Sequence, residues 1–179
     1  MIFTPTPLDG AWVVDLDRHE DSRGFFARAW DGRLFADRGL DGELAQCSVS
    51  RTPRRGTLRG LHWQEAPHAE TKLVRCTRGR IWDVMVDLRA DSPTYLHHFG
   101  IELADDSLRA VYIPRGFAHG FVTLSDHVDV MYQMSVPHAP GSERGARWND
   151  PAFGIAWPVT SPFMSERDAS YPDFPARRQ

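Results

Sequence analysis

The sequence predicts a mainly β fold in which short strands form a sandwich or a barrel. Hydrophobic residues recur with period two in many short segments, as they do in strands that bury one face. Gly, Pro and Asp separate these segments at close spacing. Patterns with the period of a helix are scarce, so we expect many strands and little helix.

The first predicted element is a short helix over 31–38, in which Leu34 and Phe35 form an apolar patch before Gly39. The first clear strand is 72–77, because successive side chains of a strand point to opposite faces and this segment alternates in character. Lys72, Val74 and Cys76 share one face of this strand.

Period-two alternation continues through the second half of the chain. It predicts strands at 81–88, 99–103, 110–113, 119–124 and 128–134. Turn signals separate them at 78–79, 104–107 and 114–116. We expect residues 1–179 to form one domain that ends in a polar, proline-containing tail at about 173–179.

Composition excludes several classes of protein. A net charge of −3 and a pI of about 6.2 argue against a nucleic-acid-binding surface. No segment is long and apolar enough for a membrane span, and residues 1–10 lack the pattern of a signal peptide. Cys47 and Cys76 have neither metal-site spacing nor a disulfide framework. We expect a cytoplasmic protein with free thiols and no nucleic-acid or membrane partner.

Lys72 is the only lysine in the chain, and the other twenty basic residues are arginines. A lysine carries a compact ammonium whose pKa can be shifted, whereas a guanidinium is planar and stays protonated. Chance in an arginine-rich composition explains a single lysine equally well, so the neighbouring residues have to decide.

The spacing around Lys72 resembles the two-part signature of the cupins, which are small jelly-roll barrels of two sheets. Gly56 precedes His62 by six residues, and Lys72 precedes Gly79 by seven. The second part of the signature matches 114–119, a Pro-Arg-Gly-Phe-Ala-His segment.

The cupin resemblance also implies that this chain binds no metal. Metal-binding cupins use two histidines and a glutamate from the first part and a histidine from the second. His62 and His119 keep the outer positions, but Gln64 stands at the second-histidine position and Lys72 at the glutamate position. A protonated ammonium cannot bind a cation and repels it. The pocket therefore suits an anion, such as a transient oxyanion on a substrate.

Taken singly, these residues suit structural roles equally well. A lone histidine such as His62 more often packs or lies at the surface, and His119 suits a structural hydrogen bond. Tyr132 shares a strand face with Val128 and Val130 and suits a core position with a satisfied hydroxyl. We expect the core to include Trp63 and Trp82, and the solvent-facing residues to include His68, His97 and His98.

Longer motifs occur in a fixed order along the chain. They are Leu-Arg-Gly-Leu-His-Trp-Gln at 58–64, Lys-Leu-Val-Arg at 72–75, Asp-Val-Met-Val-Asp-Leu-Arg at 83–89, Ile-Pro-Arg-Gly-Phe-Ala-His-Gly-Phe at 113–121, and Tyr132. Together they resemble one family, the dTDP-4-dehydrorhamnose 3,5-epimerases of sugar-nucleotide metabolism, and the resemblance covers about Asp21 to Asp168. It implies a metal-free, cofactor-free cupin jelly roll that forms a homodimer by exchange of N-terminal strands.

The family resemblance also implies roles for residues. The substrate is a nucleotide-linked 4-keto-6-deoxyhexose, whose ketone acidifies the hydrogens at C3 and C5. His62 matches the base, Asp168 the carboxylate that orients it, Lys72 the cation near the enolate oxygen and Tyr132 the acid. Further positions match substrate contacts: Arg23, reached across the dimer, and Gln46, Ser48, Arg59, Lys72, His119 and Glu143.

The chain departs from the family pattern at several positions. Four of them fall where the family contacts substrate: Arg28, Ser48, His138 and Arg167. Arg115 replaces a glutamate of the second motif, and the bulk of Met131 bears on the rotamer of Tyr132. These departures leave open which sugar nucleotide binds and whether C3, C5 or both are epimerised.

Three alternatives remain open from the sequence. A related sugar-nucleotide 3,4-ketoisomerase shares the jelly roll but fits Lys72 and Tyr132 less well. A metal-dependent cupin oxygenase is disfavoured by Gln64 and Lys72. A carbohydrate-binding cupin without activity would leave the proton-transfer residues unused.

Overall fold

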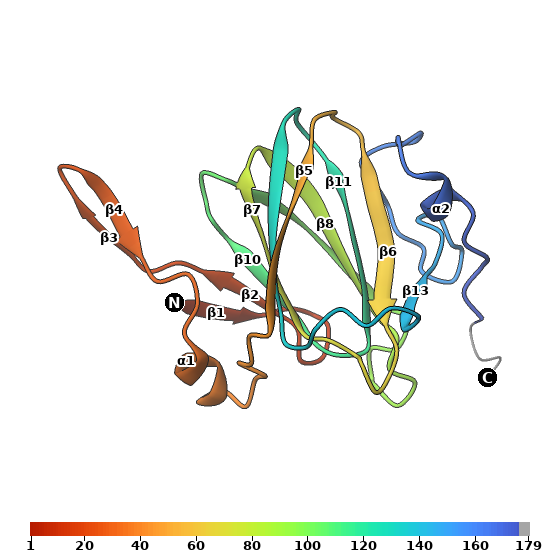
Figure 1. Ribbon diagram of the computed structural model, residues 1–179, viewed down its shortest axis with the longest axis horizontal. Helices are drawn as coiled ribbons and strands as arrows, with labels where there is room; N and C mark the ends of the chain where they lie inside the picture. The colour runs from red at the N-terminus through yellow and green to blue at the C-terminus, as the bar shows by residue number, and fades with distance from the viewer. Residues whose placement is uncertain (176–179) are drawn as a thin grey trace.

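Two antiparallel sheets face each other in the computed structural model of the chain, which describes residues 1–175 (Figure 1). The first sheet contains, in spatial order, β1 (Ile2–Pro5), β2 (Trp12–Asp15), β10 (Ala110–Ile113), β7 (Lys72–Arg78), β12 (Val128–Met134) and β5 (Gln46–Thr52). The second contains β13 (Glu143–Gly145), β6 (Leu58–Gln64), β11 (Phe117–Thr123), β8 (Arg80–Asp87) and β9 (His98–Ala104). The predicted jelly-roll class is confirmed.

The predicted elements agree closely with the observed ones. The strands predicted at 110–113 and 128–134 match β10 and β12, and the other four differ by at most two residues at either end. The predicted helix is α1 (Gly32–Ala36), which is shorter than expected at both ends. Asp31 is its N-cap and accepts a hydrogen bond from the Arg33 amide, and Asp37 is its C-cap. A second helix, α2 (Glu166–Ala169), was not predicted.

A hairpin of β3 (Arg18–Asp21) and β4 (Gly24–Ala27) extends away from the two sheets (Figure 1). Its outer residues include two exposed aromatic side chains, Phe25 at 46% and Phe26 at 70% of their full exposure. Apolar surface of this size on an extended hairpin is typical of an interface with another chain.

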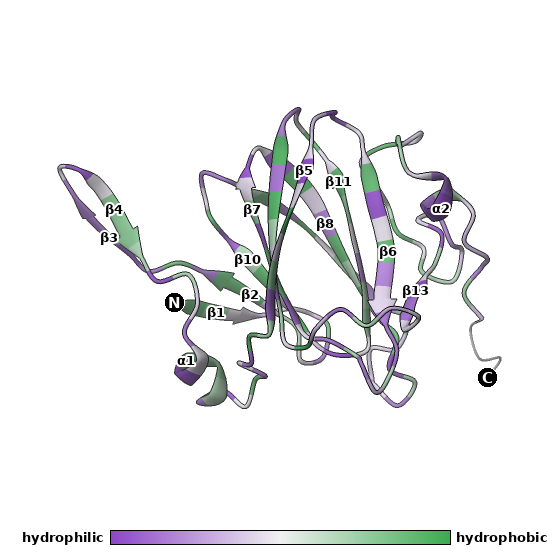
Figure 2. Ribbon diagram, viewed as in Figure 1, coloured by the Kyte–Doolittle hydropathy of each residue, from purple (hydrophilic) through white to green (hydrophobic). Residues whose placement is uncertain are grey.

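The main core lies between the two sheets. β7 supplies Val74 and Cys76, which were predicted to share one face and are both fully buried, and β12 supplies Val128 and Val130. The opposite sheet contributes Met85, Phe121 and other apolar residues to the same cluster. Figure 2 shows hydrophobic and hydrophilic residues alternating along β6, as expected for a strand with one apolar face.

A second apolar cluster covers the outer face of the second sheet. Trp63 and Trp82, which we expected in the core, are partly buried and pack against this cluster rather than between the two sheets. Phe174 packs against Trp63 and Phe153, with ring centroids 6.0 and 5.3 Å apart. Phe174, which lies within the predicted polar tail, therefore helps to cover this sheet. Residues 176–179 of that tail lie outside the described part of the chain.

Two glycines bring β6 and β11 unusually close together. A Cβ atom on Gly60 would lie 2.6 Å from the Gly120 Cα and 2.8 Å from the His119 carbonyl oxygen, and Gly60 has a φ of +122°. Only glycine tolerates both conditions. The register of the two strands shifts between His119 and Phe121, next to the pair formed by His119 and His62. This close approach places both histidines on one wall.

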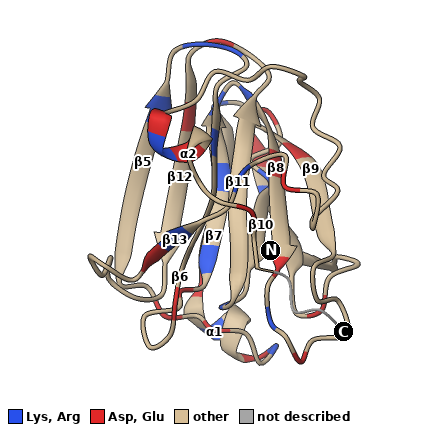
Figure 3. Cartoon of the chain, turned by 90° about the vertical axis from the view of Figure 1, so that its right-hand side faces the viewer, with Lys and Arg blue, Asp and Glu red and all other residues tan. Residues whose placement is uncertain are grey.

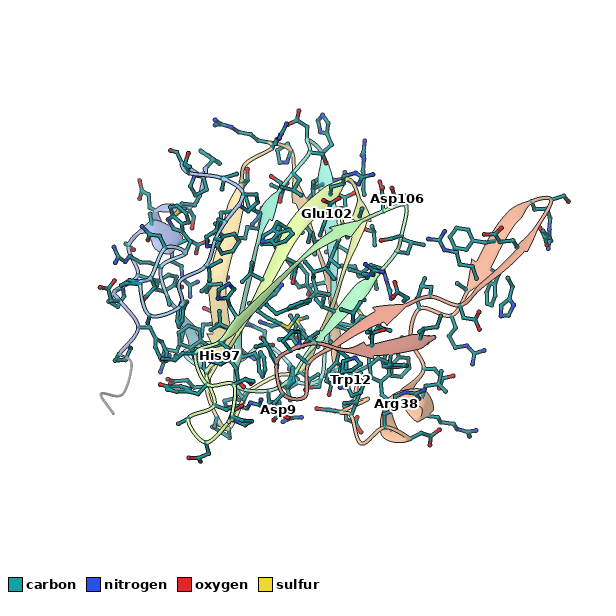
Figure 4. All side chains as sticks on the ribbon, turned by 180° about the vertical axis from the view of Figure 1, so that it is seen from behind. Asp9, Trp12, Arg38, His97, Glu102 and Asp106 are labelled. Carbon is teal, nitrogen blue, oxygen red and sulfur yellow. The ribbon has the colours of Figure 1, made fainter. Side chains whose placement is uncertain are left out.

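Figure 4 shows the molecule from behind, where Asp9, Trp12, Arg38, His97, Glu102 and Asp106 are labelled. His68, His97 and His98 are exposed, as predicted. Within residues 1–175, neither helix is long and apolar enough to cross a bilayer.

Candidate active site

A cavity of about 630 Å³ opens between the two sheets. Its lining includes residues of β6, β11, β7 and β12, and the segment that leads into α2 closes one side. α2 and β13 lie on the side of the molecule seen in Figure 3, and both carry charged residues. Eight of the residues proposed from the sequence line this cavity: Ser48, Arg59, His62, Lys72, His119, Tyr132, Glu143 and Asp168.

His62 and Asp168 form a hydrogen-bonded pair on the second-sheet wall. The His62 Nε2 lies 2.8 Å from the Asp168 Oδ1, and Oδ2 accepts a bond from the Gly60 amide at 3.2 Å. Burial opposes ionisation of Asp168, but hydrogen bonds from His62 and Gly60 outweigh it and hold the pKa of this carboxyl below its usual range. An ionised carboxylate only accepts hydrogen bonds. Nε2 therefore donates, and in a neutral imidazole Nδ1 carries the free lone pair.

Tyr132 lies on the opposite wall, on β12. Its hydroxyl lies 3.4 Å from the Ser50 Oγ, and burial raises the pKa of Tyr132 to about 12. Its ring centroid is 6.2 Å from that of His119, which belongs to the other sheet. Tyr132 is therefore a neutral phenol at physiological pH, and it faces the histidine wall across the cavity.

Lys72 lies beside Tyr132 on the same wall. It pairs in register with Met134, two residues beyond Tyr132, so the three side chains share a face of the sheet. The Lys72 Nζ lies 2.9 Å from the Glu70 Oε1, and both side chains are nearly buried, at 11% and 10% exposure. Sequence reasoning did not identify Glu70, because it precedes the alternating pattern of β7.

His119 is fixed by a carboxylate that sequence reasoning noted only as part of a motif. The His119 Nε2 lies 2.8 Å from the Asp83 Oδ2, and the two side chains are 5% and 0% exposed. The Asp83 Oδ1 is buried without a hydrogen-bond partner among the described residues. His119 therefore lines the cavity, and the buried Asp83 carboxylate fixes the orientation of its ring.

Two of the departures from the family pattern meet at Glu143. The Arg167 Nη2 lies 2.9 Å from the Glu143 Oε2, and the His138 Nε2 lies 3.4 Å from its Oε1. The hydrogen bond from Arg167 holds the pKa of Glu143 below its ordinary value. All three residues line the cavity, and their side chains are 39–58% exposed, so they form its rim.

Two proposed substrate contacts lie outside the cavity formed by the described residues. Arg23 is on the β3–β4 hairpin and pairs with Asp21. Gln46 is exposed, and its side chain accepts a hydrogen bond from the His138 amide. Met131 also lies outside the cavity lining, because it alternates with Tyr132 along β12.

Arg28 and Arg115 also lie outside the cavity lining, and each forms an ion pair. Arg28 pairs with Asp31 at 2.7 Å, and Arg115 pairs with Asp41 at 2.8 Å. The departures that touch the cavity are therefore Ser48, His138 and Arg167.

The chain matches the family model described as dTDP-4-dehydrorhamnose 3,5-epimerase over residues 5–176. A Sinorhizobium fredii protein of that name is 42% identical over 173 residues, which cover 96% of this chain and 89% of the relative. A Streptomyces niveus protein named dTDP-4-dehydrorhamnose 3-epimerase is 38% identical over 169 residues, covering 94% of this chain and 81% of the relative. The crystal structure of the 3,5-epimerase from Elizabethkingia anophelis superposes with a TM-score of 0.94 at 37% identity, covering 97% and 96% of the two chains.

Proposed function

Because this chain belongs to the dTDP-4-dehydrorhamnose 3,5-epimerase family, we propose that it epimerises C3, C5 or both in a nucleotide-linked 4-keto-6-deoxyhexose. The observation that carries this proposal is the arrangement of the cavity walls. A histidine–carboxylate pair lies on one wall, and a neutral phenol and an ammonium lie on the other. Inversion at a carbon needs a base on one face and an acid on the opposite face.

The reaction begins with proton removal by His62. The ketone at C4 acidifies the hydrogens at C3 and C5, and the free lone pair of His62 Nδ1 accepts one of them. Asp168 stabilises the imidazolium that forms and keeps the ring oriented. The bonding electrons move into an enolate whose negative charge lies on the C4 oxygen.

Lys72 stabilises that enolate. A fixed positive charge in a partly dry cavity acts most strongly where charge develops in the transition state. Its side chain is 11% exposed, so water screens it little.

Tyr132 completes the inversion by donating its proton to the face opposite His62. The raised pKa of Tyr132, about 12, keeps the hydroxyl protonated until it is needed. Substrate and product are isomers that differ only in the face carrying the hydrogen, so the step requires no redox group and we propose none.

We also propose that the active form is a homodimer in which the β3–β4 hairpin reaches the partner's cavity. Two features support this: the exposed Phe25 and Phe26, and the position of Arg23 on the same hairpin. Arginine forks suit phosphate oxygens, so Arg23 would bind the diphosphate of a substrate in the neighbouring subunit. A cytoplasmic location agrees with the free thiols of Cys47 and Cys76.

Proton NMR of dTDP-4-keto-6-deoxyglucose incubated with the protein in D₂O tests the proposal. Deuterium at C3 and C5 with inversion at both would identify a 3,5-epimerase. Deuterium and inversion at C3 alone would identify a 3-epimerase, the second candidate, which the Streptomyces niveus relative favours. Absence of exchange at both carbons would contradict the proposal for this substrate.

A further inference from the structure

We infer that Glu70 is a positioning residue that fixes the Lys72 ammonium for catalysis, and that Gln64 fixes Glu70 in turn. The inference rests on the proposed function, because it matters only if Lys72 binds the enolate oxygen. It begins from the ion pair between the Glu70 Oε1 and the Lys72 Nζ, 2.9 Å long and nearly buried.

Both carboxylate oxygens of Glu70 have partners. Oε1 binds Lys72, and Oε2 accepts a hydrogen bond from the Gln64 Nε2 at 3.1 Å. Gln64 is itself held at both ends of its amide, since Nε2 also donates to the His68 carbonyl at 3.1 Å and Oε1 accepts from the Ala139 amide at 2.8 Å. A flip of the Gln64 amide would break these bonds, so the carboxylate of Glu70 has one favoured orientation.

This row of contacts occupies two positions that are metal ligands in metal-binding cupins. Gln64 stands at a histidine position and Lys72 at the glutamate position. In a metal-binding cupin these two positions bind a metal cation, whereas in this chain Lys72 itself carries the positive charge. Glu70 adds the negative charge that a nearly buried ammonium needs, since an unpaired charge in that environment is strongly disfavoured.

The ion pair with Glu70 restrains Lys72 but does not use all the hydrogen-bond donors of its ammonium. A lysine side chain is flexible, and a shift of about 1 Å at a reacting centre can cost on the order of 100-fold in rate. An ammonium has three N–H donors. Among the residues that the structure describes, Glu70 is the carboxylate that binds Nζ, so donors remain for the enolate oxygen.

A carboxylate next to Lys72 has an opposing effect, because it weakens the positive field at the enolate. The two effects predict opposite signs. If Glu70 mainly positions Lys72, its removal lowers kcat; if it mainly weakens the field, its removal raises kcat.

The first test is Glu70→Gln in the full-length protein. The amide has the shape of the carboxylate, but it cannot accept from Lys72 and Gln64 at once without turning a donor toward one of them. We expect kcat for deuterium exchange to fall about tenfold or more, with KM within about twofold of wild type. Glu102→Gln makes the same change in an ion pair with Arg80 on the far side of the molecule (Figure 4) and is the control.

A double-mutant cycle with Lys72→Met shows whether Glu70 acts through Lys72. We expect Glu70→Gln to have no further effect once Lys72 is gone. If Lys72→Met alone keeps wild-type exchange, Lys72 does not stabilise the enolate. That part of the proposed function is then wrong, and so is the inference on Glu70. If Lys72→Met strongly lowers exchange while Glu70→Gln leaves kcat unchanged or raises it, the inference is wrong and the proposed function stands.

The single lysine provides a measurement that does not depend on activity. Labelling with ¹⁵N,¹³C-lysine reports on Lys72 alone, since the chain contains no other lysine. We expect a rigid side chain whose Nζ protons exchange slowly with water in the wild type, and faster exchange in Glu70→Gln. A mobile, rapidly exchanging ammonium in the wild type would overturn the inference even if the variant failed to fold.

Discussion

His62 on β6 donates a 2.8 Å hydrogen bond from Nε2 to Oδ1 of Asp168 on α2, across 106 positions of sequence. The lowered pKa of Asp168 keeps this partner ionised at neutral pH, which fixes the tautomer of the histidine. We therefore predict that Asp168→Asn lowers kcat for C3 and C5 deuterium exchange by about 100-fold or more, because an amide does not enforce that tautomer.

Asp106→Asn is the matched control for this variant. Asp106 pairs with Arg80 at 2.8 Å on the far side of the molecule, and its side chain is 63% exposed. This control should keep kcat within about twofold of wild type. Equal losses in the two variants, or full activity in Asp168→Asn, would contradict the orienting role.

The same carboxylate predicts how stability depends on pH. The pKa of Asp168 is lower in the folded protein than its ordinary value of 3.8, so the ionised carboxylate stabilises the fold above about pH 4. This contribution is lost as pH falls through the folded pKa. The difference in unfolding free energy between wild type and Asp168→Asn should therefore shrink between pH 7 and pH 3, measured by urea titration. A difference that grows on acidification would show that the pKa of Asp168 is raised instead.

Tyr132→Phe should separate proton exchange from inversion. His62 would still remove and return protons on its own face, so deuterium should enter the substrate while its configuration is retained. Net epimerisation should fall about 100-fold or more, because the acid on the opposite face is missing. NMR detection of exchange and of product configuration in the same sample measures both quantities.

Tyr112→Phe is the control for the loss of a hydroxyl. Tyr112 lies on β10 outside the cavity lining, and its oxygen accepts a 2.8 Å hydrogen bond from the Asp41 amide. We expect it to cost about 1 kcal/mol of stability and to leave exchange with inversion intact. If Tyr132→Phe still inverted the substrate at the wild-type rate, another group would have to be the acid.

The alternation of apolar residues predicted the cavity wall formed by β7 and β12, but it did not predict the residue that holds the Lys72 side chain in place. Period-two alternation grouped Lys72 with Val74 and Cys76, and Tyr132 with Val128 and Val130. These apolar neighbours lie in the core between the sheets, so Lys72 and Tyr132 lie on that side of the sheet as well. Glu70 precedes β7, where no alternation exists, and its contact with Lys72 arises only when the loop folds back.

Asp83 illustrates a different difficulty. It appears in the sequence as the polar member of an alternating strand, yet β8 is covered on both faces and Asp83 is fully buried against His119. The meeting of His62 with Asp168 was expected only from the family resemblance, because no local pattern links two residues 106 positions apart.

The rim residue His138 is predicted to affect binding rather than chemistry. It lines the cavity beside Glu143, and its side chain is 53% exposed. His138→Ala should raise KM for the sugar nucleotide about threefold or more and keep kcat within about twofold. His97→Ala, an exposed histidine on the far side, should change neither constant (Figure 4). A fall in kcat with constant KM would place His138 in the proton-transfer machinery instead.

Mixed dimers test whether Arg23 acts in the partner's cavity. Arg23→Ala alone should raise KM about tenfold or more, as expected for loss of a charged hydrogen bond to phosphate. His62→Asn alone should abolish turnover. In a heterodimer of these two variants, the cavity with an intact His62 receives the intact Arg23 from the other subunit. One of its two sites is then complete, and the other carries both changes.

The heterodimer is obtained by co-expression with two different affinity tags and sequential purification. We expect wild-type KM and about half of the wild-type kcat per dimer. If the hairpin served its own subunit, each site of the heterodimer would carry one defect and its activity would not exceed that of the parent variants.

Phe26→Asp removes exposed apolar surface from the hairpin and should weaken the dimer in analytical ultracentrifugation, because 70% of that side chain is otherwise left in water. A fully active monomer of this variant would show that the hairpin is not needed to complete the site.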